Sequence, residues 1–84
     1  MKYRFALLEI QWDDATANSD WQHPSSINPV PEIAVTVGFL VKETDGHIVI
    51  ASTDGGEASG VTASMQIPKK MIISRRTLAR ARKV

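Results

Sequence analysis

The feature that most constrains the fold is a β-hairpin signature in the middle of the chain. Residues 32–42, EIAVTVGFLVK, follow the two-residue period of a pleated strand. That period puts five apolar side chains on one face of the strand: Ile33, Val35, Val37, Phe39 and Val41. The Asp-Gly pair in residues 44–47 is typical of a type I′ turn, and residues 47–53, HIVIAST, supply the return strand. Gly38 predicts a bend or bulge in the first strand, of the kind that small barrels need.

Three further segments predict strands on either side of this hairpin. Residues 3–12, YRFALLEIQW, contain no Gly or Pro and suit a largely buried strand, with a short helix as the alternative. Residues 61–67 alternate apolar and polar side chains like a half-exposed strand, and residues 71–74 form a last short strand after Pro68. Five short strands joined by turns predict a mainly β fold, specifically a small five-stranded SH3-like or Sm-like barrel.

Two segments lie outside this strand pattern. Residues 13–31 are rich in Asp, Asn, Ser and Pro, which predicts a long loop after the first strand. The barrel domain is expected to span residues 1–75. Residues 76–84 are then a basic C-terminal tail, either a short helix capped by Thr77 or a disordered segment.

Length and composition limit the class of protein. A chain of 84 residues has room for one core, and 43% hydrophobic residues suffice to build it. The absence of cysteine excludes disulfides, thiolate zinc sites and thiol nucleophiles. We find neither a membrane-spanning run nor a signal-peptide pattern, so we expect a soluble, cytoplasmic protein with no membrane partner.

The charge of the chain is strongly polarised. Residues 1–68 carry three basic and nine acidic side chains, whereas residues 69–84 carry seven basic side chains and no acidic one. The candidate phosphate or nucleic-acid contacts are Lys69, Lys70, Arg75, Arg76, Arg80 and Arg82. Two alternatives remain open: a solvated end, or docking of the basic end on the acidic body of a neighbouring subunit.

The densest aromatic and polar cluster is the segment WDDATANSDWQH at residues 12–23. Trp12 and Trp21 are candidates for stacking on a base or, more simply, for anchoring the long loop to the barrel. Neither histidine has a second one at metal-ligand spacing, and the serines and threonines lie in no motif that supplies an activating base. We therefore expect no metal, no cofactor and no enzymatic activity.

Two parts of the sequence carry a resemblance. The stretch QWDDATANSDW, and TVGFLVKETDGHIVIAST followed downstream by IPKKMI, are similar to small proteins of unassigned function that bacteriophages and prophages encode. That resemblance implies a phage origin and a small barrel, but no activity. The bent second strand and short fifth strand give a looser likeness to Sm-like and Hfq-like ring proteins. Residues 45–48, DGHI, stand where many Sm proteins have a base-binding Asp-x-x-Met-Asn loop.

These observations lead to one leading hypothesis and two alternatives. The leading hypothesis is a non-enzymatic phage accessory module that forms homo-oligomers and contacts nucleic acid or a host macromolecule through its basic end. The first alternative is a sponge that sequesters a signalling nucleotide used in host defence. The second is a structural or protein-blocking role in which the acidic body makes the contact with a host protein.

Overall fold

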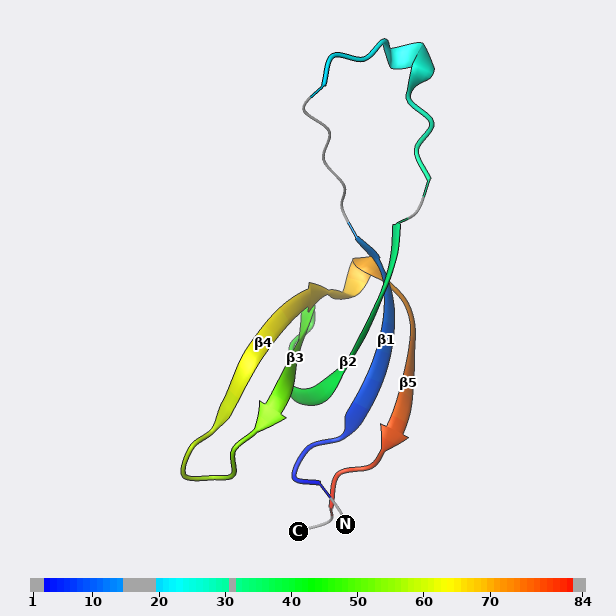
Figure 1. Ribbon diagram of the computed structural model, residues 1–84. Helices are drawn as coiled ribbons and strands as arrows, with labels where there is room; N and C mark the ends of the chain where they lie inside the picture. The colour runs from blue at the N-terminus through cyan, green and yellow to red at the C-terminus, as the bar shows by residue number, and fades with distance from the viewer. Residues whose placement is uncertain (1–2, 15–19, 31, 83–84) are drawn as a thin grey trace.

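The computed structural model describes residues 3–14, 20–30 and 32–82. Five strands form one antiparallel sheet. Numbered along the chain, they are β1 (Leu7–Asp14), β2 (Glu32–Glu43), β3 (His47–Asp54), β4 (Val61–Pro68) and β5 (Ile72–Ala79). The strand order is β4-β3-β2-β1-β5, so β4 and β5 are the two edges of an open sheet (Figure 1). The predicted mainly β fold of five strands is confirmed. Helical structure in the described ranges consists of two 3₁₀ turns, η1 (Pro24–Ser26) and η2 (Lys69–Met71).

The predicted hairpin is formed by β2 and β3, but its turn is not of type I′. A type I′ turn needs positive φ at both central residues, and neither Asp45 nor Gly46 has one. The connection contains three residues and is closed by Thr44, whose backbone N–H donates to the carbonyl of His47 at 2.9 Å. The Thr44 hydroxyl also accepts the backbone N–H of His47, at 3.1 Å. These two bonds close the turn without left-handed backbone.

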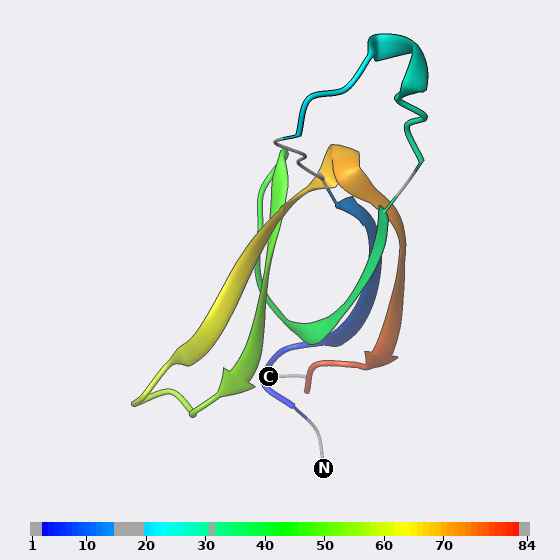
Figure 2. The ribbon, with the colours of Figure 1, turned by 45° about the horizontal axis from the view of Figure 1, so that its top comes forward.

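Strand β2 curves so strongly that its two halves pair with different neighbours (Figure 2). Residues 32–39 pair with β1, whereas residues 39–43 pair with β3, with a bulge between Leu40 and Lys42. Gly38 lies between the two halves. A Cβ atom at this position would collide with the Ile50 Cγ2 atom and would lie 2.8 Å from the carbonyl oxygen of Ala51. The predicted bend therefore depends on glycine because the chain passes too close to β3 for a side chain.

The core lies on the inner face of this curved sheet. Its buried members come from β1, β3 and β4: Leu8, Ile10, Ile48, Ile50 and Ile67. Trp12 of β1, Leu40 of β2 and Ile72 of β5 are partly buried and pack against them. The buried face of β1 is the Leu8 and Ile10 face alone, although the sequence predicts burial on much of both faces. On β2 the alternating residues Ile33, Val35 and Val37 face outward.

The C-terminal residues continue the sheet. We expect a helix or a disordered segment from residue 76, yet β5 extends through Ala79 and pairs with β1 along its length. The pairing supplies the backbone hydrogen bonds that a helix would otherwise provide. Beyond β5, Arg82 donates its backbone N–H to the carbonyl of Tyr3 at 2.7 Å, and Ala81 forms a parallel bridge with Tyr3. The two ends of the described chain thus lie side by side (Figure 1).

Candidate binding surface

The predicted basic residues lie along one edge of the sheet. Lys69 and Lys70 are in η2, Arg75 and Arg76 are in β5, and Arg80 and Arg82 follow that strand. The edge strand β5 has eight residues and is about 25 Å long, and these side chains lie along it and at both of its ends. They follow one another along this edge, with Arg75 on the core face and Arg76 on the outer face, and are not gathered in one pocket. We call this the β5 basic edge.

At one end of the β5 basic edge, two cations share a carboxylate from β2. The Lys69 Nζ atom lies 2.8 Å from one oxygen of Glu43, and Arg75 Nη1 lies 3.3 Å from the other. Hydrogen bonds from Lys69 and then Arg75 hold the pKa of Glu43 below its ordinary value. Together with Ile72, these three residues line an open hollow of about 320 Å³. The Arg75 register partner on β1 is the buried Ile10, so its side chain starts on the core face and reaches across to the end of β2.

The remaining cations differ in how far they are neutralised. Arg76 lies directly opposite Glu9 on β1 and reaches its carboxylate at 3.1 Å, an exposed cross-strand ion pair. Arg82 lies 3.8 Å from Glu57. Lys70 and Arg80 are exposed and make no ion pair with any residue in the described ranges. Six basic side chains therefore face three carboxylates, which leaves an excess of three positive charges on the β5 basic edge.

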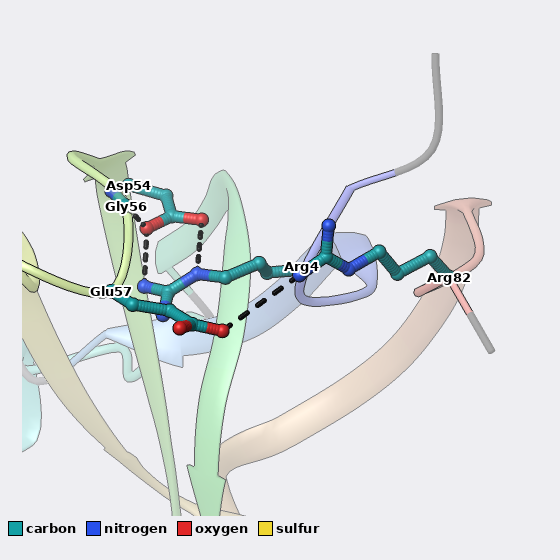
Figure 3. A network of polar contacts seen from close by, with 5 residues as sticks. All are labelled: Arg4, Asp54, Gly56, Glu57 and Arg82. Atoms are coloured by element: carbon teal, nitrogen blue, oxygen red, sulfur yellow. Dashed lines mark hydrogen bonds and ion pairs between the residues drawn. The ribbon is translucent and has the colours of Figure 1, made fainter. Parts of the chain in front are cut away.

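A polar network that the sequence analysis missed ties the N-terminal segment to the end of β3 (Figure 3). The Arg4 guanidinium donates from Nε and Nη2 to the two carboxylate oxygens of Asp54, with the Nε contact at 3.0 Å. Asp54 also accepts the backbone N–H of Gly56 at 3.0 Å. Hydrogen bonds from Arg4, followed by Gly56, lower the pKa of Asp54, and the contact with Asp54 raises the pKa of Arg4.

This network borders a hollow of about 460 Å³. Tyr3 and Phe39 form its apolar wall, with ring centroids 5.5 Å apart and planes at 71°, an edge-to-face arrangement. Arg82 and Glu57 complete the rim (Figure 3). The Arg4 and Asp54 side chains are only 22% and 15% exposed, so we assign them a mainly structural role. Arg4 lies 50 residues from Asp54, and no local motif marks the pair.

The two tryptophans have different environments. Trp12 packs against the core and donates its indole N–H to the Thr36 hydroxyl at 3.0 Å, so it fastens β1 to β2. Trp21 is fully exposed in the segment that projects away from the sheet (Figure 1), so it does not anchor that segment to the sheet. The hollow that contains Lys69 and Arg75 has no tryptophan in its lining. The structure therefore does not bring either indole together with these two cations.

Within residues 3–14, 20–30 and 32–82, no group of three His, Asp or Glu side chains is placed to hold a metal ion. No helix in those ranges is long and apolar enough to cross a membrane. Comparisons with protein-family models, with curated proteins and with solved structures find no match. The resemblance to phage-encoded proteins stays a prediction.

Proposed function

We propose that this protein is a non-enzymatic phage accessory module that binds nucleic acid through the β5 basic edge. The observation that carries the proposal is the distribution of charge along β5. Basic side chains occur at both ends and in the middle of an edge strand, and the carboxylates within reach neutralise only half of them. A phosphate backbone is a linear array of negative charges, so it matches a linear cationic edge better than a point ligand does.

The same geometry favours a polymer over a single signalling nucleotide. In the hollow that holds Lys69 and Arg75, both cations already flank Glu43, and Ile72 is the apolar residue of the lining. No aromatic ring lines that hollow to stack on a base. A nucleotide sponge would give a thermal shift with cyclic or linear nucleotides, whereas the β5 basic edge predicts none.

The test is fluorescence anisotropy with a labelled single-stranded oligonucleotide. Lys70 and Arg80 are the cations without a carboxylate partner, so the double variant Lys70→Gln/Arg80→Gln removes two positive charges without breaking an ion pair. We expect weaker binding and a slope of log K against log [salt] that is shallower by about 0.7 for each phosphate that the variant no longer binds. Lys42→Gln, an exposed cation on β2, is the matched control and should bind like the wild type. Equal binding by all three proteins would refute the proposal, and binding to a host protein instead would support the protein-blocking role.

We further propose that the sheet closes toward an SH3-like or Sm-like barrel. Two features support closure: η2 connects the two edge strands along the chain, and Arg75 reaches Glu43 across the core face. Because β4 and β5 do not pair with each other in this sheet, each leaves an edge that can pair with a second copy, which supports a homo-oligomer. Ile73 is a 54% exposed residue at the bulge in β5, so Ile73→Lys should lower the mass in solution if β5 pairs between copies. An unchanged mass would exclude that contact.

A further inference from the structure

Exposed apolar side chains are concentrated in one part of the sheet. Along the first half of β2, Ile33, Val35 and Val37 are 50%, 58% and 50% exposed and follow one another on the outer face. Their register partners on β1 are Asp13, Gln11 and Glu9, so a polar row borders the apolar row on that side. A contiguous exposed apolar row of this kind is a candidate contact surface.

The backbone of the same segment is unpaired on its other side. Strand β3 pairs with β2 only from Phe39 to Glu43, because β2 turns away at Gly38. Residues 32–38 therefore hydrogen-bond to β1 on one side and have no strand partner on the other within the described ranges. An unpaired strand edge is a template for another strand, since each free N–H and C=O group can join a new ladder.

The segment is complementary to itself. In an antiparallel pair centred on Val35, Val35 faces its own copy and Ile33 faces Val37 of the other chain, so all three apolar residues meet apolar residues. The opposite face of this ladder would bring the small residues Ala34 and Thr36 together. No charged side chain lies between residues 33 and 38, so no like charges oppose each other there. A shift of the register by two residues in one direction would place Ile33 opposite Phe39, which already pairs with Ala51 on β3.

We propose that the first half of β2 pairs with the same segment of a second copy of this chain, and that this forms a two-fold symmetric dimer with a continuous sheet. The contact is isologous, because one segment supplies both sides of it. It is independent of the β5 basic edge and of pairing through β4 or β5. A negative result for nucleic-acid binding would therefore leave the proposed dimer contact unaffected.

The test exploits the symmetric position of Val35 and uses mass determination by light scattering after gel filtration. Val35→Lys places two cations directly opposite each other, and Val35→Glu places two carboxylates there, so each variant alone should lose at least half of the wild-type mass. An equimolar mixture pairs Lys with Glu and should restore the wild-type mass as a heterodimer. Thr53→Lys, at an exposed residue of the inner strand β3, is the control and should keep the wild-type mass.

A thermal melt of each variant accompanies the mass measurement. Val35 is more than half exposed, so both variants should fold and give cooperative transitions. A monomeric wild type, unchanged masses in both single variants, or a mixture that stays dissociated would each overturn the proposal. Restoration of the mass by the mixture would distinguish self-pairing at Val35 from binding of a different protein, because only self-pairing places residue 35 of one copy opposite residue 35 of the other.

Discussion

The substitution Gly38→Ala tests whether the close approach of β2 to β3 determines the curvature of the sheet. The new Cβ would collide with Ile50 Cγ2 and would meet the backbone carbonyl oxygen of Ala51 at 2.8 Å. Ile50 is only 2% exposed and belongs to the core, so its side chain has little space to move, and the backbone of Ala51 is held in β3. Overpacking of this kind costs about 1–3 kcal/mol. The reduced entropy of the unfolded alanine chain offsets about 0.4–1 kcal/mol.

We therefore expect Gly38→Ala to lower the free energy of unfolding by about 1–2 kcal/mol. In a domain of this size each kcal/mol lowers Tm by about 4–8 °C. Circular dichroism during thermal and urea unfolding measures both quantities. Gly46→Ala is the control, since no heavy atom lies within 4 Å of a Cβ there and its φ is not positive, so its Tm should stay the same or rise slightly. If Gly38→Ala were as stable as Gly46→Ala, the close approach would not determine the fold.

Three further predictions concern the rest of the sheet. Asp54→Asn should lower the free energy of unfolding at neutral pH, because it removes the carboxylate that pairs with Arg4. Arg4 lowers the pKa of Asp54 in the folded protein, so the wild type should be more stable than the variant above the ordinary Asp pKa of about 3.9. This difference in stability should disappear as the pH falls through the lower pKa of the folded state. Parallel urea midpoints that never converge in acid would contradict this. Ala63→Gly should raise stability by about 0.5–1 kcal/mol because Ala63 has φ of 53°, and a lower Tm would count against strain there. Trp12→Phe should cost about 1 kcal/mol because it removes the hydrogen bond to Thr36, measured by urea unfolding; an unchanged midpoint would show that the bond contributes nothing.

Local patterns were sufficient to predict that five strands form, but not that β5 extends through Ala79. The alternation in residues 32–42 and 61–67, and the turn residues between them, correctly predict β2, β3 and β4 as strands. Alternation does not determine which face is buried: the apolar row of β2 faces outward, because the register with β1 directs Leu8 and Ile10 inward. The predicted turn type was wrong because the hydrogen bonds between Thr44 and His47 close the connection, and the Asp-Gly pair does not indicate these bonds.

The candidate site was predicted in part. The run of basic residues after Pro68 is visible in the sequence, but its shape depends on β5 pairing with β1 through Ala79. A run of basic residues with no acidic ones has the sequence pattern of a solvated tail. Its backbone forms a strand here because β1, distant in sequence, provides the hydrogen-bond partners. Which cations are neutralised also depends on contacts distant in sequence: Arg75 meets Glu43, which is 32 residues away, and Arg76 meets Glu9, 67 residues away. No spacing rule in a single sequence predicts such pairs.

The most direct test of the proposed function is the salt dependence of binding to a single-stranded oligonucleotide, measured by anisotropy over a series of salt concentrations. The excess of three positive charges on the β5 basic edge predicts a slope of log K against log [salt] of about −2, since each phosphate contact contributes about −0.7 on single strands. A slope near that value, reduced in Lys70→Gln/Arg80→Gln, is the result that we predict. Binding that is absent at low salt, or a slope near zero, would contradict nucleic-acid binding through β5.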